Sequence, residues 1–197
     1  MDPFKEYKPI LEEYLHKEVI PHLEAAWHEP WRFYHGMNHL ITILETLKEQ
    51  RTKIHPLEYD TLVLAAFFHD CYYNTRDHKV NEHESINRFT SSFKSSKKPL
   101  YWKVSSAVVE MILATKFRKV PNSKLIKIFW EADNAGFYKG YEALLEYENL
   151  IRKEYVHVSK KQYKKGRVDF LKTNLGLFNE SVDRDVNRLI EYVNVNY

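Results

Sequence analysis

Apolar residues recur at helical spacing along almost the whole chain, and this periodicity is the strongest constraint on its fold. In the segment 38–50, Leu40, Ile43, Leu44 and Leu47 fall three or four positions apart, as one face of an α-helix requires. The 5 glycines and 7 prolines are few for an all-β protein, which needs many tight turns. The sequence therefore predicts an all-α helical bundle that folds as a single domain over residues 1–197.

The same periodicity, with breaks at polar stretches and at proline, divides the chain into expected helices. They cover residues 4–28 (interrupted near Pro21), 38–50, 56–71, 81–94, 99–115, 122–134, 138–157, 159–175 and 181–194. Asn38 is the expected N-cap of its helix, and Pro56 suits the first turn of the next. Residues 72–80 are expected to form a polar loop, and the Ser- and Lys-rich stretch 91–99 an exposed connection.

Composition excludes several classes of protein. The 30 basic and 27 acidic residues give a net charge of +3, which is no strong signal for nucleic-acid or membrane-surface binding. Cys71 is the only cysteine, so no internal disulfide forms, as is typical of a reducing compartment. The charged N-terminus is unlike a signal peptide, and no apolar stretch approaches the ~20 residues that span a bilayer. We expect a soluble, cytoplasmic protein. The apolar face of its last helix could be core or interface, so the protein could be a homo-oligomer.

Histidines and carboxylates stand at the ends of three expected helices. His69 and Asp70 end the most hydrophobic one, where an unpaired carboxylate is costly to bury. His39 lies near the start of another, four residues after His35. Asp133 ends a third, although the helix dipole disfavours a carboxylate there. Each has an ordinary explanation as a capping or salt-bridged residue, but a metal ion would satisfy all of them together.

The order His, His-Asp, Asp resembles the signature of the HD superfamily of metal-dependent phosphohydrolases, which have an all-α fold. The likeness is closer to a branch of small predicted HD phosphohydrolases and spans roughly residues 31–178. Its motifs are Arg32-x-Tyr34-His35-x-x-x-His39, Phe68-His69-Asp70-x-x-Tyr73, Asn81-Glu82-x-x-Ser85, Ala114-Thr115, Ala132-Asp133, Ile151-Arg152-x-Glu154-Tyr155 and Tyr163-x-x-Gly166-Arg167. The first of these is also similar to a motif of the cyclic-nucleotide phosphodiesterases, which are distant HD relatives.

The resemblance implies hydrolysis of a phosphomonoester or phosphodiester bond in a small molecule, with a nucleotide as the expected substrate. The implied metal ligands are His39, His69, Asp70 and Asp133. Two imidazoles and two carboxylates suit Mn²⁺, Fe²⁺, Co²⁺, Ni²⁺ or Zn²⁺ better than Mg²⁺. One ion per chain is expected, because no histidine follows Ala114-Thr115, where relatives often have one.

Catalytic roles are implied for three residues. Asp70 would act with the metal, and His35 is the candidate proton donor, with Glu82 as the other candidate. Basic and aromatic residues of the same motifs are the expected substrate contacts, because arginine offers bidentate geometry to phosphate. These contacts are Arg32, Tyr34, Lys116, Arg152, Tyr155 and Arg167. Packing in the core is the competing interpretation of Tyr155.

Two other functions use the same scaffold. Some HD proteins are di-iron oxygenases, which need about six ligands and would recruit His78 or His83 as extra ones. We expect both of these histidines on the surface. A non-catalytic module that binds a nucleotide or a partner protein is the third possibility, although pure binding does not require four metal ligands.

Overall fold

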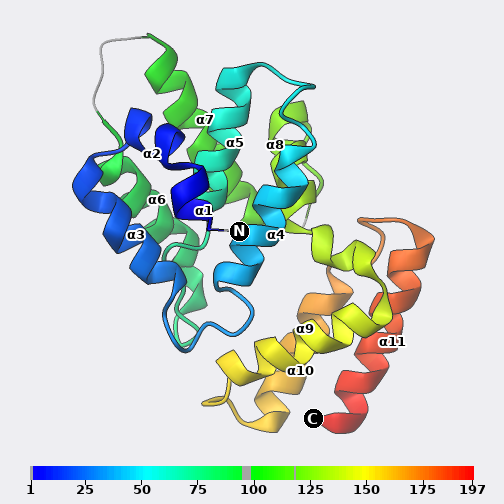
Figure 1. Ribbon diagram of the computed structural model, residues 1–197. Helices are drawn as coiled ribbons and strands as arrows, with labels where there is room; N and C mark the ends of the chain where they lie inside the picture. The colour runs from blue at the N-terminus through cyan, green and yellow to red at the C-terminus, as the bar shows by residue number, and fades with distance from the viewer. Residues whose placement is uncertain (1, 95–98, 118) are drawn as a thin grey trace.

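The computed structural model describes residues 2–94, 99–117 and 119–197, and this part of the chain is all-helical (Figure 1). The prediction of an all-α bundle is therefore confirmed. In order, the α-helices are α1 (Pro3–Glu6), α2 (Lys8–Tyr14), α3 (Ile20–Trp27), α4 (Met37–Lys48), α5 (Pro56–Phe68), α6 (Asn81–Ser92), α7 (Pro99–Lys116), α8 (Lys124–Asp133), α9 (Tyr141–Glu154), α10 (Lys160–Lys172) and α11 (Glu180–Asn196). Three 3-10 helices are η1 (Lys17–Val19), η2 (His78–Val80) and η3 (Ala135–Lys139).

Most expected helices form within a few residues of their predicted bounds, but the first segment differs. It divides into α1, α2, η1 and α3, and Pro21 lies in the first turn of α3 instead of interrupting a helix. Asn38 lies inside α4, whose N-cap is Gly36, so the predicted cap is wrong. The predicted loop 72–80 contains η2. Of the predicted connection 91–99, residues 95–98 lie outside the described residues.

A large hydrophobic core joins α1 to α8, with α5 as its central helix. The capping box of His55 and Glu58 starts α5, and Pro56 occupies its first turn as predicted. From Leu62 to Phe68 every residue is at most 1% exposed, so the C-terminal half of α5 has no solvent face. Because it is surrounded on all sides, its C-terminal end is held in one position inside the bundle.

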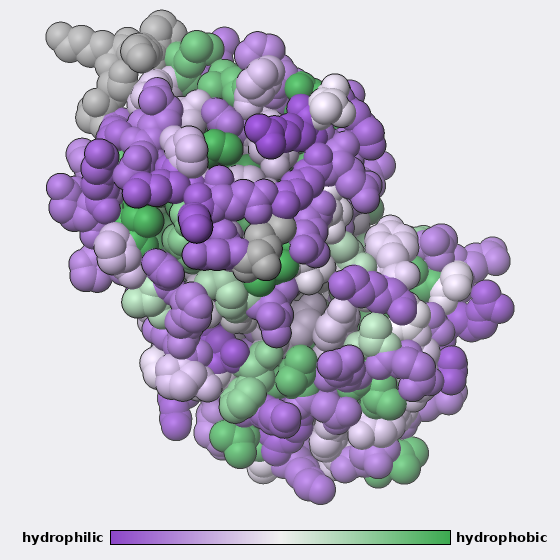
Figure 2. All heavy atoms as spheres, in the orientation of Figure 1, coloured by the Kyte–Doolittle hydropathy of each residue, from purple (hydrophilic) through white to green (hydrophobic). Residues whose placement is uncertain are grey.

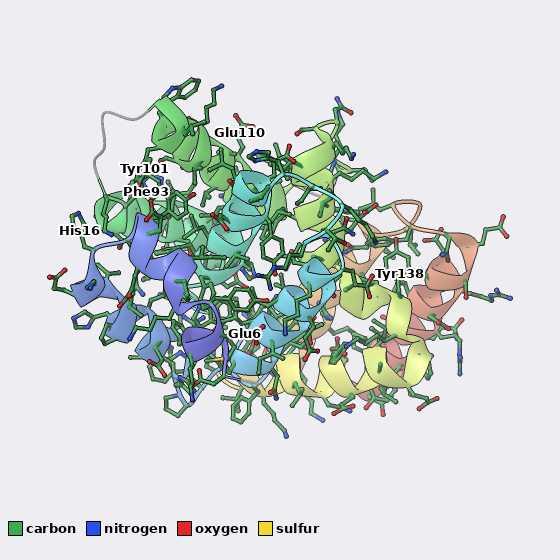
Figure 3. The ribbon with its side chains drawn as sticks, turned by 45° about the horizontal axis from the view of Figure 1, so that its top comes forward. Glu6, His16, Phe93, Tyr101, Glu110 and Tyr138 are labelled. Atoms are coloured by element: carbon green, nitrogen blue, oxygen red, sulfur yellow. The ribbon has the colours of Figure 1, made fainter. Side chains whose placement is uncertain are left out.

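Contacts at the edge of this core tie distant segments together. Phe93, just after α6, and Tyr101, near the start of α7, lie close together, with ring centroids 5.8 Å apart (Figure 3). Glu6 of α1 forms an ion pair with Lys48 of α4 at 2.7 Å. The first contact ties α6 to α7, and the second ties α1 to α4.

A second, smaller core joins α9, α10 and α11, which form a separate group of helices in Figure 1. Its fully or nearly buried members include Leu171, Val186, Leu189 and Val193. The apolar face of the last helix, which the sequence left open as core or interface, is thus packed inside this group. The visible surface over both groups is mainly hydrophilic (Figure 2). Within the described ranges, no helix is long and apolar enough to cross a membrane.

Candidate metal centre

Three helix ends bring the four predicted ligands to one place. His39 lies in the first turn of α4, His69 is the C-cap of α5 with Asp70 directly after it, and Asp133 is the last residue of α8. Both α4 and α8 pack against α5 and against each other. The convergence therefore follows from how the large core is assembled.

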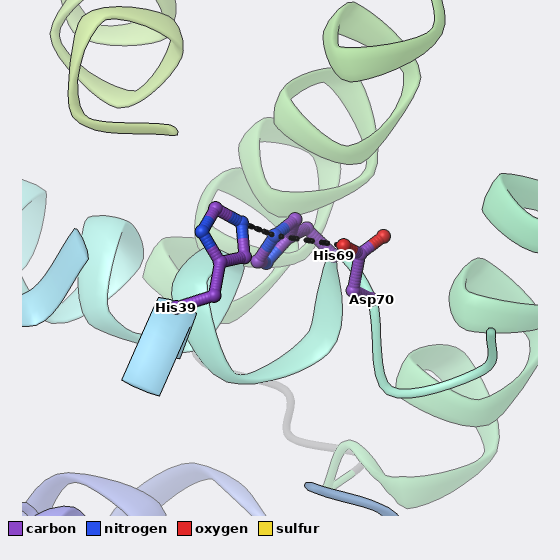
Figure 4. Close-up of side chains that lie close together, drawn as sticks. All are labelled: His39, His69 and Asp70. Carbon is purple, nitrogen blue, oxygen red and sulfur yellow. Dashed lines mark hydrogen bonds and ion pairs between the residues drawn. The ribbon is translucent and has the colours of Figure 1, made fainter. Parts of the chain in front are cut away.

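The ligand atoms of these residues face one another at short distances. The Nε2 atom of His69 lies 3.3 Å from Nε2 of His39 and 3.4 Å from Oδ2 of Asp70 (Figure 4). Oδ1 of Asp133 lies 3.2 Å from Nε2 of His39 and 3.5 Å from Nε2 of His69. His39, His69 and Asp70 each offer an atom within 4.8 Å of the others, so this group can hold a metal ion.

Spacing of this kind fits one shared divalent ion. Metal–ligand bonds of about 2.1 Å at angles of about 90° to 109° place neighbouring ligand atoms about 3.0 to 3.4 Å apart. The four distances given above fall in or just beyond that range. The residues of this chain therefore fit the mixed nitrogen and oxygen ligand set that the sequence predicted.

The His69 ring is oriented so that Nε2 faces the two carboxylates. Its Nδ1 atom lies 2.9 Å from the carbonyl oxygen of Ala66, which only accepts hydrogen bonds, so Nδ1 carries the proton. In the neutral ring Nε2 then carries a lone pair, and the Asp70 and Asp133 carboxylates face it. A lone pair repels these oxygens, whereas a metal ion or a second ring proton attracts all three atoms. A backbone carbonyl on the remote nitrogen is also a common way to orient a ligand histidine.

Arg32 links the segment after α5, which carries Asp70, to the loop before α4. Its guanidinium donates to the backbone oxygens of Asp70 at 2.5 Å, Cys71 at 3.3 Å and His35 at 3.3 Å, and Nε donates to Glu29 at 2.7 Å. Only 1% of the Arg32 side chain is exposed. Four of its five N–H donors are thus used inside the protein, and Arg32 does not line the cavity beside the cluster, so its contact with substrate stays a prediction.

The loop before α4 approaches its neighbours closely at Gly36. A Cβ atom there would lie 2.9 Å from the carbonyl oxygen of Arg32, so no larger residue fits without a backbone shift. The glycine thus lets the loop turn tightly between Arg32 and the start of α4. This tight turn places Tyr34 over His39, with the ring centroids 5.3 Å apart and the planes nearly parallel at 29°.

His35 is held by Glu154, which comes from the last turn of α9. Oε2 of Glu154 lies 2.7 Å from Nδ1 of His35, and Oε1 accepts from the backbone N–H groups of Tyr34 at 2.7 Å and His35 at 2.8 Å. The side chain of Glu154 is 1% exposed. Burial alone would raise its pKa, but the charge and hydrogen bonds of His35 and the two backbone donors lower it below the ordinary value.

The orientation of the His35 ring follows from these contacts. A carboxylate only accepts, so Nδ1 carries the proton and Nε2 is the atom left to exchange one. Tyr73 stacks on the ring with centroids 4.1 Å apart, which fixes its plane. Glu154 was not among the predicted site residues, although the signal that pointed to Asp133, a carboxylate at the C-terminal end of a helix, applies to both.

A cavity of about 710 Å³ opens beside the ligand cluster and extends to the C-terminal helices. The four predicted metal ligands line it together with six of the other predicted site residues, Tyr34, His35, Glu82, Lys116, Tyr155 and Arg167. His78, a ligand only in the di-iron alternative, lines it as well. The two hydrophobic cores therefore meet at one cavity that holds most of the predicted site.

Arg152 is the second predicted substrate contact that the structure uses elsewhere. Its guanidinium donates to the backbone oxygens of Tyr155 and Val158, at 2.5 and 3.1 Å, and lies 4.7 Å from the ring centroid of Tyr163. It does not line the cavity described above. Arg152 thus closes the turn after α9, and its contact with phosphate stays a prediction.

Other polar residues that line the cavity have partners within the protein. Lys116 forms an ion pair with Glu82 at 3.4 Å and donates to the carbonyl oxygen of Lys79 at 3.1 Å. His78 and His83 are exposed, as the sequence predicted. Tyr155 is half-buried and hydrogen-bonds with Tyr73, so it is both a packing residue and part of the cavity wall.

Comparison of the chain with protein-family models, with curated proteins and with solved structures found no match in any of the three.

Metal binding should stabilise the folded protein. With Mn²⁺ or Zn²⁺ at 100 times its dissociation constant, we expect Tm to rise by roughly 5–10 °C, because only the folded chain assembles the ligands. His69→Ala should abolish this increase. His83→Ala removes an exposed histidine and should retain it. Differential scanning fluorimetry of the metal-stripped protein, with and without added metal, makes the comparison. A wild-type Tm that does not change with any of the metals would contradict the site.

The Glu154 ion pair should make stability depend on pH. Because the pKa of Glu154 is lowered from 4.5 on folding, its contribution is complete above pH 4.5 and is lost as the pH falls through the folded value. We expect Glu154→Gln to cost about 1.5–3 kcal/mol at pH 7 and much less in acid. Urea unfolding at several pH values measures this, with Glu146→Gln, an exposed carboxylate on the same helix, as the control. An equal loss at every pH would refute the assignment.

Proposed function

We propose that this protein is a metal-dependent phosphohydrolase of the HD type that cleaves a phosphate ester of a small molecule, with a nucleotide as the favoured substrate. The observation that carries the proposal is the meeting of His39, His69, Asp70 and Asp133 at three helix ends, beside a cavity that also holds His35. The resemblance of the sequence motifs to HD phosphohydrolases supports the reaction type. It also supports a transition metal, one ion per chain, as the cofactor.

The ligand set suits hydrolysis at phosphorus. A divalent ion in such a site supplies an acidic water and polarises a phosphoryl oxygen. Asp70 and Asp133 together offset a charge of +2, which leaves the bound phosphate to be countered by other groups. Their partial exposure, 18% and 15% of the side chains, keeps the site open on the side of the cavity.

His35 is the group best placed to protonate the leaving oxygen. Glu154 occupies its Nδ1 atom, so Nε2 is left to deliver a proton into the cavity that His35 lines. Glu82, the other candidate, is instead engaged by the ammonium of Lys116 at 3.4 Å. These contacts support His35 as the proton donor and Glu154 as the residue that positions it.

The two other functions have less support. A di-iron centre needs about six ligands, and the metal-binding group found in the described part of the chain contains three residues, with Asp133 as the fourth. The exposed His78 and His83 lie outside that group. A module that only binds a nucleotide would not need a fixed proton donor such as His35.

A metal-supplemented substrate screen tests the reaction. We expect the wild-type protein, loaded with Mn²⁺, Fe²⁺, Co²⁺, Ni²⁺ or Zn²⁺, to release phosphate from at least one nucleotide or phosphomonoester, or to cleave a phosphodiester. The double variant His69→Ala/Asp70→Ala should lose about a thousandfold or more of this rate, because the ion contributes several kcal/mol to the transition state. His83→Ala should be unaffected. Unchanged turnover in the double variant would contradict the metal-dependent mechanism.

The role of His35 predicts a dependence on the leaving group. His35→Asn should slow the hydrolysis of an alkyl phosphate ester by about 10² to 10⁴, the usual contribution of a general acid. A 4-nitrophenyl ester leaves without a proton and should be slowed far less. Glu154→Gln should follow the same trend more weakly, with kcat affected more than KM. Equal losses on both esters would show that His35 does not protonate the leaving group.

A further inference from the structure

The half of the cavity next to α9, α10 and α11 is lined mainly by apolar and aromatic side chains. Its wall contains Leu144, Tyr147, Ile151, Phe170, Leu171 and Leu189. Arg167 lies among them as a single arginine, and it is the cationic side chain of this wall in the described residues. A single guanidinium gives an apolar wall a strong local preference for a negatively charged group.

Arg167 is held in place by a buried carboxylate. Its Nε atom donates to Oε2 of Glu148 at 2.5 Å, and the Tyr163 hydroxyl donates to Oε1 of the same carboxylate at 2.7 Å. Glu148 is 0% exposed, and 12% of the Arg167 side chain is exposed. Burial would lower the pKa of Arg167, but the Glu148 charge outweighs it and raises the pKa, so the guanidinium stays charged.

The Glu148 contact uses only one edge of the guanidinium. Nε is the nitrogen that Glu148 accepts from, and the described residues give the two terminal nitrogens no hydrogen-bond acceptor. Phe170 supports the plane of the group, with its ring centroid 4.8 Å from Cζ of Arg167. The end of the fork that binds a carboxylate or phosphate in a bidentate way is thus left for the cavity.

A buried ion pair is weak evidence for stability, because apolar residues of similar size often stabilise a core as well or better. Glu148, Tyr163 and Arg167 together fix one guanidinium at the cavity wall. Tyr34 connects this wall to the ligand cluster: it stacks on His39, and the charges of both Asp133 and Arg167 act on its pKa. The guanidinium and the ligand cluster therefore serve the same cavity from different sides.

We propose that Arg167 forms a second anion subsite, which binds a carboxylate or phosphate group that the substrate carries in addition to the phosphoryl group at the His39/His69/Asp70/Asp133 cluster. The substrate class is then a phosphate ester with an apolar or aromatic body and a second negative charge. This inference rests on the proposed function for the identity of the first group. The binding of an anion by Arg167 does not depend on turnover.

The direct test is anion binding to metal-free protein. Inorganic phosphate and benzoate, titrated separately, represent the two chemistries, and the Nε–H resonance of Arg167 reports the site in an ¹H–¹⁵N NMR spectrum. Arg167→Lys keeps the charge beside Glu148 but removes the fork. We expect it to weaken binding by about 10- to 100-fold, the loss of a charge-assisted pair of hydrogen bonds. Lys165→Gln, an exposed cation on the same helix, should bind as the wild type does.

Two further measurements keep the result clear. Glu148→Gln/Arg167→Gln removes both charges together, and it should lose phosphate binding while its far-ultraviolet circular dichroism and its Mn²⁺ affinity stay unchanged. A phosphate affinity in Arg167→Lys equal to that of the wild type would overturn the subsite. If phosphate binds tightly and benzoate does not, the second group is a phosphate; the reverse result makes it a carboxylate.

Turnover separates the subsite from the reaction. On phenyl phosphate and 4-carboxyphenyl phosphate, which differ by one carboxylate, the wild type should have a lower KM for the second, and Arg167→Lys should lose that preference. Equal KM values in the wild type would contradict the subsite. If neither ester nor any nucleotide is hydrolysed by metal-loaded protein, the proposed function fails, while the NMR titration still decides whether Arg167 binds anions.

Discussion

Two carboxylates converge on the Nε2 atom of a buried imidazole, and the rest of the site depends on this convergence. Asp70 and Asp133 face Nε2 of His69, whose other nitrogen is committed to a backbone carbonyl. The hydrophobic core holds these groups together because they stand at the ends of packed helices. An arrangement that a shared cation would stabilise is therefore built into the fold, and the stability of α5 supplies the rigidity that it needs.

The C-terminal helices complete the cavity instead of forming a detached appendage. Glu154 at the end of α9 accepts three hydrogen bonds from Tyr34 and His35, which belong to the loop before α4. Arg167 of α10 adds a fixed guanidinium to the same cavity. The large core thus carries the predicted metal ligands, and the small core carries the residues that orient the neighbouring histidine and line the opposite wall.

The arginines show where motif-based prediction stops. Arg32, Arg152 and Arg167 share the same chemistry and occupy similar motifs, so the sequence offered all three as phosphate contacts. In the structure, the guanidinium groups of Arg32 and Arg152 donate to backbone carbonyl oxygens. Arg167 alone among the three lines the cavity. What differs is which acceptors lie nearby, and those acceptors come from distant parts of the chain.

The sequence by itself determined the helices and the four candidate ligands, because helical periodicity and the position of a charged residue at a helix end are local properties. It did not determine that Gly36 caps α4, nor that Glu154 holds His35, since Glu154 lies 119 residues away along the chain. Only the tertiary structure decided which side chains share the cavity. Packing of the two cores fixes those distances, and packing depends on contacts that no local pattern contains.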